Sequence, residues 1–399
     1  MTAKATSYTG YVAWSEELLG VFTAGVSEIA GSDKVGGTYG HNVYDTLASP
    51  IRIEIQRGWA ADLSAVEQGT MVLTLPDATA IYNPENATGA LYTLLDVMRP
   101  TKAEAVLSGT TYGLFAGFNT RVAHNPMSKR ATIKAADFFE MLDREKPLLT
   151  ETYTNQRVDT LIGYILDYCG LSNPNDRDLD VSRDIIPSWG ATGITTALSL
   201  IQTLLSTDLG WFFVNGDGVV CYRNRDVYYA DSGPTVLPSP LRDTSLEVAI
   251  DHDGIVNSQT VTRTGGVAQT ATDAASINKR GYFYGSAITS ANLVDDAQAM
   301  SLATFIVGLK ATPRPPTRPL GYRNVDSTTL AQILTAEIGD LVTAPVDAAG
   351  NTITGRIQAI RHTVESGKLH DLRLTVRECG QTIFQAGISE IAGAHIVGY

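Results

Sequence analysis

Cysteine is scarce in this chain, and the pattern of the few that occur excludes whole classes of site. The three cysteines, Cys169, Cys221 and Cys379, lie far apart among 399 residues, and no Cys-x-x-Cys pair occurs. Structural zinc sites and redox dithiols need closely spaced cysteines, so the sequence argues against both. Cys169 falls on the apolar stripe of an expected helix, where a thiol behaves as a small hydrophobic side chain. We therefore expect all three to be buried structural residues.

Charge is also low, and it is not clustered. Charged residues make up 18% of the chain, and 42 Asp and Glu outweigh 30 Lys and Arg to give a formal charge of −12. Binding nucleic acid without sequence preference needs clustered cations, and the nearest approach, residues 314–323, is too thin. No apolar run approaches the roughly 18 residues of a membrane span, and no secretory signal opens the chain. We expect a protein made in a cytosol, without a membrane-spanning segment.

The usual catalytic motifs are missing as well. The six histidines are scattered, without an HExxH or HxH pair, and no G-x-S-x-G elbow, phosphate-binding loop or dinucleotide fingerprint occurs. Acidic turns at residues 176–180 and 251–254 lack the twelve-position loop of a calcium site, which favours solvated turns. His362 and His370 fall on neighbouring expected strands, where exposed or satisfied imidazoles are commoner than ligands. The sequence predicts no enzyme, cofactor or metal site, although a carboxylate pair for glycoside hydrolysis stays open because its spacing is spatial.

What the chain does contain is a series of strand patterns in its first third. Apolar residues alternate with polar ones, the two-residue period of strands that bury one face. Turns separate them, including one at Asn83-Pro84, where proline fixes φ and disfavours helix. With a short helix at residues 137–142, the block predicts an antiparallel barrel or sandwich. The expected strands cover residues 51–55, 71–75, 103–107, 112–118 and 131–135.

The middle of the chain changes to helical periodicity. From residue 158 to Cys169, apolar residues recur at the i, i+3, i+4, i+7 spacing of one helix face, and Gly170 follows as a C-cap. A second helix is expected at residues 195–207. A hairpin is expected at residues 209–223, since its Asn-Gly and Asp-Gly steps supply the positive φ of tight turns.

Shorter elements are expected after residue 245. Two strands are expected within residues 246–264, and the polar Thr/Ala-rich run up to residue 275 is expected to be a loop. Asp295 and Asp296 suit a helix start, because carboxylates are stabilised at the positive end of the helix dipole. That helix is expected to end at residue 309.

The last region has strands at residues 355–362 and 369–377 and predicts a second small barrel. The expected fold class is mainly β with α+β segments, in two small β-barrel domains interleaved with helix-containing domains. The expected domains are an N-terminal barrel (1–150), a helical segment with a hairpin (151–245), a strand–helix domain (246–325), and a second barrel with the C-terminal segment (326–399).

An internal echo relates the two ends of the chain. Residues 21–31 recur as residues 383–393, without the regular period of a solenoid. The plainer interpretation is a duplicated strand-turn edge at the two barrels, and the sharper one is that both copies contact a ring-shaped partner. The candidate partner contacts are Phe22, Glu28, Ile29, Phe384, Glu390 and Ile391.

Three ordered blocks of short motifs resemble phage minor tail proteins of the baseplate or tail-hub family. The second block is G-W-F-F-V-N-G-D-G-V-V-C-Y-R-N-R from Gly210, and the third is S-I-x-x-x-G, D-D-A-Q-A, L-A and P-R-P from Ser276 onward. The blocks span most of the chain between residues 51 and 377. The first block consists of Gly69-Thr70, Asn83-Pro84, Arg99-Pro100-Thr101 and Leu114-Phe115-Ala116-Gly117-Phe118.

The resemblance implies a homotrimer at the tip of a virion tail, where two barrels in each protomer let three copies meet a sixfold tail ring. The implied partners are the distal tail protein, the tape-measure protein, and tail fibre or spike proteins. The implied role is mechanical, adapting tail rings to the tip and gating genome passage during infection. The chain stops soon after the expected last barrel, so we expect no appended receptor-binding or peptidase domain.

Two alternatives come from other functional classes. Exposed tyrosines, such as Tyr228-Tyr229 or Tyr282 and Tyr284, could bind a host glycan in an adhesion protein, although packing between strands is the commoner use of tyrosine. A cell-wall hydrolase is the second alternative, and no motif favours it.

Overall fold

The computed structural model describes most of the chain. The described residues are 7–13, 45–47, 49–58, 67–149, 151–191, 193–228, 235–239, 252, 254–290, 292–313, 318–323, 327–345, 352–365 and 369–378. Cys379 and both copies of the internal echo lie outside these ranges.

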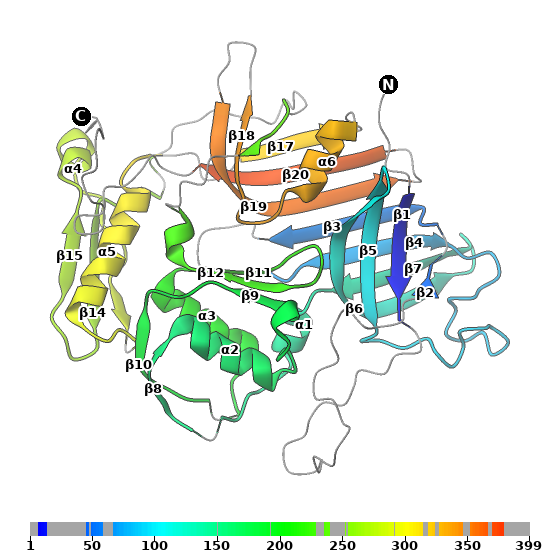
Figure 1. Cartoon of the computed structure of the whole chain (residues 1–399), viewed down its shortest axis with the longest axis horizontal. Helices are drawn as coiled ribbons and strands as arrows, with labels where there is room; N and C mark the ends of the chain where they lie inside the picture. The colour runs from blue at the N-terminus through cyan, green and yellow to red at the C-terminus, as the bar shows by residue number, and fades with distance from the viewer. Residues whose placement is uncertain are drawn as a thin grey trace.

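One twelve-stranded sheet forms the largest part of the fold, at the top and right of Figure 1. Its main path is β13-β18-β19-β3-β4-β7-β6-β5-β1-β2, while β20 pairs with β19 and β17. Buried and exposed residues alternate along β3, as the expected strand period requires. The bounds are β1 (Ser7–Val12), β2 (Asp45–Thr46), β3 (Arg52–Gly58), β4 (Thr70–Pro76), β5 (Pro100–Leu107), β6 (Thr110–Asn125), β7 (Arg130–Ala136), β13 (Thr235–Val236), β17 (Arg318–Arg323), β18 (Leu341–Pro345), β19 (Thr352–Glu365) and β20 (Leu369–Glu378).

The strands of the two expected barrels are joined to one another instead of closing separately. β19 pairs with β18 over residues 352–356 and with β3 over residues 359–365. A strand has two hydrogen-bonding edges. β3 uses one for β4 and the other for β19, which belongs to the second expected barrel, so neither edge is left to close a separate N-terminal barrel. The expectation of closed barrels is therefore corrected, since no sheet in the described ranges closes into one. The expected class, mainly β with α+β segments, is confirmed.

The sheet bends over itself, so that its first strand covers strands from the middle. A Cβ on Gly10 of β1 would lie 2.9 Å from Leu73 Cδ1 of β4, although these two strands do not pair. In Figure 1, β1 and β5 cross in front of β3 and β4 at a steep angle. The enclosed core includes Ile53, Leu73 and Phe115, and α6 (Ser327–Thr335) adds Leu330 to it. Crossed sheet layers of this kind bury their inner faces against each other.

A helical unit, green in Figure 1, lies below the sheet. α2 (Val158–Tyr168) confirms the first expected helix, and Gly170 just beyond it takes the positive φ of +85° that suits glycine. α3 (Ala197–Asp208) follows Thr196, whose side chain caps it by accepting from Ser199 N. The expected hairpin is confirmed as β11 and β12. The other bounds are α1 (Phe139–Leu142), β8 (Tyr153–Arg157), β9 (Arg177–Leu179), β10 (Ile185–Trp189), β11 (Trp211–Val214), β12 (Val220–Arg223), and the 3-10 turns Pro174–Asp176 and Arg225–Tyr228.

A third unit stands at the left of Figure 1, where α5 packs on β14 and β15. Asp295 caps α5 by accepting from Gln298 N, which confirms the expected helix start. The expected loop up to residue 275 is wrong in part, because β15 lies within it. Threonines favour strands, and Thr260 and Thr270 hydrogen-bond across the pair. The bounds are β14 (Ser258–Arg263), β15 (Gln269–Thr272), α4 (Ala274–Arg280), β16 (Ile288–Ser290) and α5 (Asp296–Lys310).

Among the helices of the described residues, none combines the length and apolar character that crossing a membrane would require.

Candidate functional site

The partner contacts expected from the internal echo have no described geometry. All six lie outside the described residues, so the echo stays a prediction. These residues are Phe22, Glu28, Ile29, Phe384, Glu390 and Ile391.

The two described cysteines are packing residues, as expected. Cys169 and Cys221 are both free and buried. Burial raises the pKa of each thiol to about 12, so neither is a thiolate nucleophile near neutral pH. Nor do the described residues contain a group of three or more His, Cys, Asp or Glu side chains that could hold a metal ion.

His362 and His370 are satisfied imidazoles inside the protein. His362 Nδ1 lies 3.0 Å from His370 Nε2, and His370 Nδ1 lies 2.8 Å from the Tyr8 hydroxyl. This chain connects β19, β20 and β1 where the sheet bends over itself. Burial lowers the pKa of His370 to about 4 and that of His362 well below 6.5, so both rings are neutral at pH 7. Their arrangement joins strands and leaves no imidazole free as a ligand.

A histidine and an aspartate also meet at the start of the loop after β4. Asp77 accepts from His124 Nδ1 at 2.7 Å and from the backbone N–H groups of Ile81 (2.7 Å) and Tyr82 (3.2 Å). The three hydrogen bonds that this carboxylate accepts come from the loop and from β6. The pair resembles the base and orienting acid of a catalytic triad, but here it holds the loop in place.

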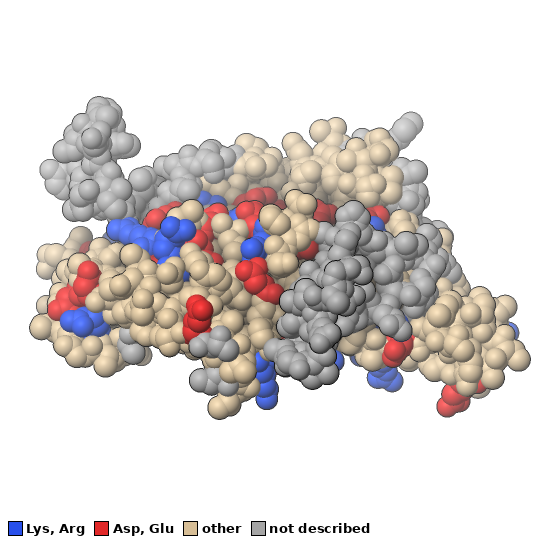
Figure 2. Space-filling view, turned by 60° about the horizontal axis from the view of Figure 1, so that its bottom comes forward, with Lys and Arg blue, Asp and Glu red and all other residues tan. Residues whose placement is uncertain are grey.

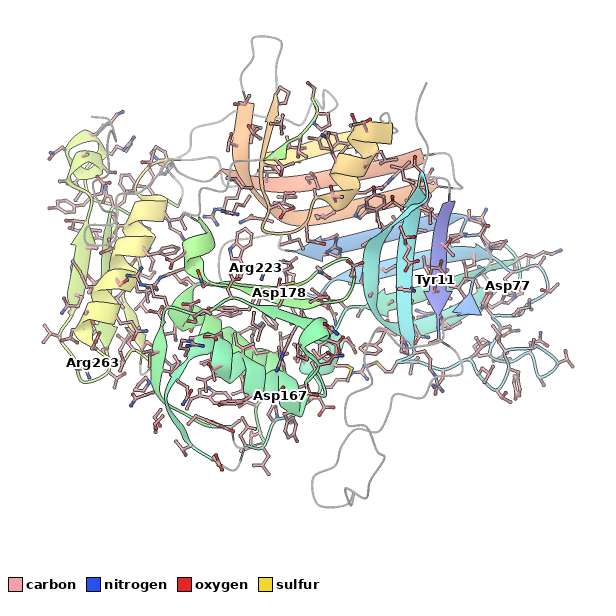
Figure 3. The ribbon with its side chains drawn as sticks, viewed as in Figure 1. Tyr11, Asp77, Asp167, Asp178, Arg223 and Arg263 are labelled. Atoms are coloured by element: carbon pink, nitrogen blue, oxygen red, sulfur yellow. The ribbon has the colours of Figure 1, made fainter. Side chains whose placement is uncertain are left out.

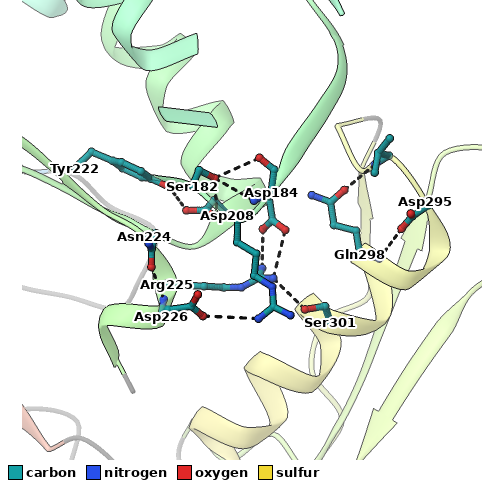
Figure 4. A network of polar contacts seen from close by, with 12 residues as sticks. Ser182, Asp184, Asp208, Tyr222, Asn224, Arg225, Asp226, Asp295, Gln298 and Ser301 are labelled. Atoms are coloured by element: carbon teal, nitrogen blue, oxygen red, sulfur yellow. Dashed lines mark hydrogen bonds and ion pairs between the residues drawn. The ribbon is translucent and has the colours of Figure 1, made fainter. Parts of the chain in front are cut away.

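A buried polar network lies between the helical unit and α5 (Figure 4). Asp184 pairs with Arg225 at 2.8 Å, and these side chains are 3% and 1% exposed. Arg225 also donates to Ser301 of α5 at 3.1 Å. Asp208 accepts from the Tyr222 hydroxyl and from Ser182. The three charged side chains at its centre, Asp184, Asp208 and Arg225, are all buried.

Asp184 and Asp208 are two interacting carboxylates with raised pKa values, so we compare them with the carboxylate pair that glycoside hydrolysis needs. Burial first, and then the charge of Asp184, raise the pKa of Asp208 to about 7, while burial raises that of Asp184. A raised carboxyl pKa suits a general acid, but Asp208 is 0% exposed and no sugar can reach it. The network therefore joins two units of the fold.

A second junction lies between the sheet and the tip of the β11–β12 hairpin. Arg57 of β3, 3% exposed, pairs with Glu337 at 2.7 Å and donates to Val214 O at 3.3 Å. Glu337 in turn accepts from Gly216 N at 2.9 Å. A Cβ on Gly216 would lie 2.3 Å from Gly113 O of β6, so glycine is required for the hairpin to approach the sheet.

A hollow of about 380 Å³ opens on the outer face of α2, beside Asp167 (Figure 3). Its charges are already neutralised within the chain, because Arg177 pairs with Asp167 at 2.6 Å and Asp159 pairs with Arg157 at 3.0 Å. Figure 3 also shows Asp178 and Arg223 side by side on β9 and β12, where they form another ion pair. The hollow thus offers a ligand no uncompensated charge.

Charges of both signs are also interspersed on the surface. On the face in Figure 2, acidic and basic side chains occur in small mixed groups among a larger uncharged area. Such a face lacks the single-sign field that would steer a highly charged partner.

Comparisons with known proteins relate the whole architecture to one class. No family model and no curated protein matches the sequence. In structure, the chain resembles the tail protein from Neisseria meningitidis, with a TM-score of 0.55 and 11% identity over 93% of this chain and 96% of that one. It also resembles the 43 kDa tail protein of prophage MuSo2 from Shewanella oneidensis, with a TM-score of 0.54 and 11% identity over 84% of this chain and 94% of that one. The chain has a phage tail protein fold. The resemblance drawn from the sequence motifs is thereby confirmed at the level of fold.

Sequence reasoning did not find the polar junctions. Arg225 appears in the sequence only as the last residue of the second motif block, and no motif includes Arg57. Charged side chains are seldom fully buried, so an isolated Arg or Asp carries no signal that it will be. The Asn-Gly step at Asn215 did mark the hairpin tip that the second junction receives.

Proposed function

We propose that this chain is a structural component of a bacteriophage tail, placed at the tail tip as a hub that adapts tail rings and gates genome passage. The observation that carries the proposal is the correspondence of fold with the Neisseria tail protein over 93% of this chain and 96% of that one. End-to-end correspondence means that the order of all units is shared, whereas a common small domain would match only in part.

The polar junctions fit a mechanical role. Buried ion pairs add little net stability over apolar packing, but breaking one is costly, so they fix one arrangement of the parts they join. From its ion pair, Arg225 of the helical unit also donates to Ser301 of α5, and Arg57 of β3 also donates to Val214 O of the hairpin. A tail component that carries load between neighbours needs such fixed internal geometry.

The assembly we propose is a homotrimer that contacts the distal tail protein, the tape-measure protein, and fibre or spike proteins, within the virion and without catalysis. The four-part division at residues 150, 245 and 325 stays a prediction. Light scattering on the purified chain tests the trimer, for which we expect three times the 42.7 kDa of one chain. A stable monomer at all concentrations would contradict it.

Electron microscopy of virions that carry a labelled copy of this chain tests the position. We expect label at the end of the tail, and label along the tube or on the capsid would refute the tip assignment. Incubation of the protein with host cell walls tests the absence of catalysis, for which we expect no release of muropeptides.

A further inference from the structure

Two tyrosine rings stand together in solvent on the third unit. Tyr282 and Tyr284 are 59% and 73% exposed. Their rings stack with centroids 5.3 Å apart and planes 6° from parallel. The two residues lie on the extended segment between α4 and β16, on either side of Phe283. Large aromatic surfaces are usually buried, so a stacked pair held in water calls for a reason.

Buried polar side chains fix the backbone that carries these rings. Asn257 is fully buried, and its amide donates to Gly281 O at 2.8 Å and accepts from Phe283 N at 2.8 Å. Its own backbone N–H donates to Phe283 O at 3.0 Å. The backbone is therefore held on both sides of Tyr282 by one buried side-chain amide, which fixes the position of the exposed ring.

A second buried amide supports the far end of the segment. Gln259 donates to Ser286 O at 2.8 Å, and Gly285 N donates to Ser258 O at 2.9 Å. A Cβ on Gly285 would come within 1.9 Å of Gln259 Oε1, so only glycine fits beside this support. The backbone on both sides of Tyr284 is thus held by hydrogen bonds, through Phe283 and through Gly285.

Two cations precede the ring pair along the chain. Lys279 and Arg280 occupy the last turn of α4, three and two residues before Tyr282, and neither forms an ion pair with a described residue. Most described arginines face a carboxylate, whereas Lys279 and Arg280 do not. Aromatic faces and uncompensated cations together suit a ligand with a flat apolar face and a negative charge.

We propose that Tyr282 and Tyr284 form a binding platform for pyranose units of an acidic polysaccharide, with Lys279 and Arg280 binding the carboxylate of a uronic acid. The axial C–H bonds of a pyranose present a weakly positive face to the negative face of an aromatic ring. The tyrosine hydroxyls and the two cations supply polar contacts around it. This site is additional to the structural role and does not depend on where the chain sits in a virion.

Single-stranded nucleic acid fits the same site less well. Successive bases need successive open rings along a cationic groove. Here the two rings cover each other's inner faces instead of forming a row of open rings, and the adjoining cations number only two. An oligonucleotide therefore serves as a competing ligand in the test.

The test is calorimetric titration of the full chain with oligogalacturonate, with a neutral malto-oligosaccharide and with oligothymidylate. We expect saturable binding of oligogalacturonate, weakened about fivefold by Tyr284→Ala, since one aromatic contact contributes about 1 kcal/mol. Replacing Lys279 and Arg280 by Gln should weaken oligogalacturonate binding and leave the neutral sugar unaffected.

Matched controls are Tyr92→Ala, an exposed tyrosine in the loop after β4, and Lys134→Gln, an exposed cation on β7. Both should bind oligogalacturonate like the parent chain. Absence of saturable binding, binding that Tyr284→Ala leaves unchanged, or binding of oligothymidylate alone would each overturn the proposal. Thermal melts of every variant confirm that folding is retained.

Discussion

Two Arg–Asp pairs lie beside α5, and they differ in burial while sharing their chemistry. On the side of the helical unit, Arg225 contacts Ser301 of α5 and pairs with Asp184, with 1% and 3% of the two charged side chains exposed. On the side of β14, Arg263, labelled in Figure 3, pairs with Asp296 in the first turn of α5, with 33% and 35% exposed. Water can replace the second contact when it breaks, but it cannot replace the first.

The difference shows where the fold depends on charge. Within the third unit, α5 packs on β14 and β15 through apolar residues such as Leu302 and Val261. Between units, the seam at Arg225 consists of a cation, two carboxylates and their hydrogen-bonding partners. Apolar packing tolerates small displacements, whereas a sealed ion pair loses its compensation once a partner is removed. The seam between units is therefore the place where single substitutions should do the most damage.

The largest effect is expected for Arg225→Met. Methionine fills much of the same volume but leaves Asp184 and Asp208 buried without a cation, which should cost about 3–5 kcal/mol of unfolding free energy. Scanning calorimetry should show a lower unfolding temperature. Adding Asp184→Leu to the same chain should recover much of the loss, because the charge of Asp184 is then gone and Asp208, whose pKa Asp184 helps to raise, loses its repelling neighbour. If the Arg225→Met chain unfolds at the same temperature as the parent, the buried ion pair does not stabilise the seam and the contrast with Arg263 fails.

Asp208→Asn tests the same seam through pH. Burial raises the pKa of Asp208 from 3.8 to about 7. A carboxyl group whose folded pKa exceeds its unfolded pKa stabilises the fold fully below pH 3.8, and the contribution is lost as pH rises through about 7. Asparagine does not titrate. Urea unfolding at pH 4 and pH 8 should therefore show the parent losing about 2–4 kcal/mol more than the variant over this interval. Parallel pH profiles would exclude this role for Asp208.

The histidine chain at the bend of the sheet should respond with the opposite sign. Burial lowers the pKa of His370 from 6.5 to about 4, and Asp371 opposes this only in part. Since the folded pKa lies below the unfolded one, the unfolded chain binds more protons and stability falls as pH drops from 6.5 to about 4. His370→Gln keeps groups that can bond Tyr8 and His362 but removes the titration. The parent should lose about 1–3 kcal/mol more than this variant between pH 7 and pH 4. Equal losses would show that the ring is charged in the fold.

Local periodicity made some elements predictable. α2 follows directly from the spacing of Val158, Leu161 and Ile165, which are all buried, and the start of α5 follows from its capping carboxylate. The pairing of β3 with β19 was not predictable, because each strand shows only its own alternation and nothing in it names a partner 300 residues away. β15 was missed because its threonines are polar as well as strand-forming.

The tyrosine pair and the polar junctions also differ in how much of them local sequence can predict. The exposed tyrosines could be noted from their crowding in the sequence, but the stacking of Tyr282 on Tyr284 depends on the clamp at Asn257. Burial of Arg225 depends on how two units meet, and no local pattern encodes it. Sequence motifs therefore indicate the fold, whereas the polar seams depend on how its units meet in three dimensions.

The smallest effect is expected for Arg263→Met, the counterpart of the first substitution on the other side of α5. Asp296 is one-third exposed and also lies in the first turn of the helix, where the dipole and water both stabilise a carboxylate without Arg263. The loss should be about 0.2–1 kcal/mol and should shrink further in 0.5 M salt, because exposed pairs are screened. Calorimetry of both Arg-to-Met variants in low and high salt compares the two sides directly. If Arg263→Met were as damaging as Arg225→Met, burial would not be what separates the two contacts, and the apolar packing of α5 on β14 would have to depend on that ion pair.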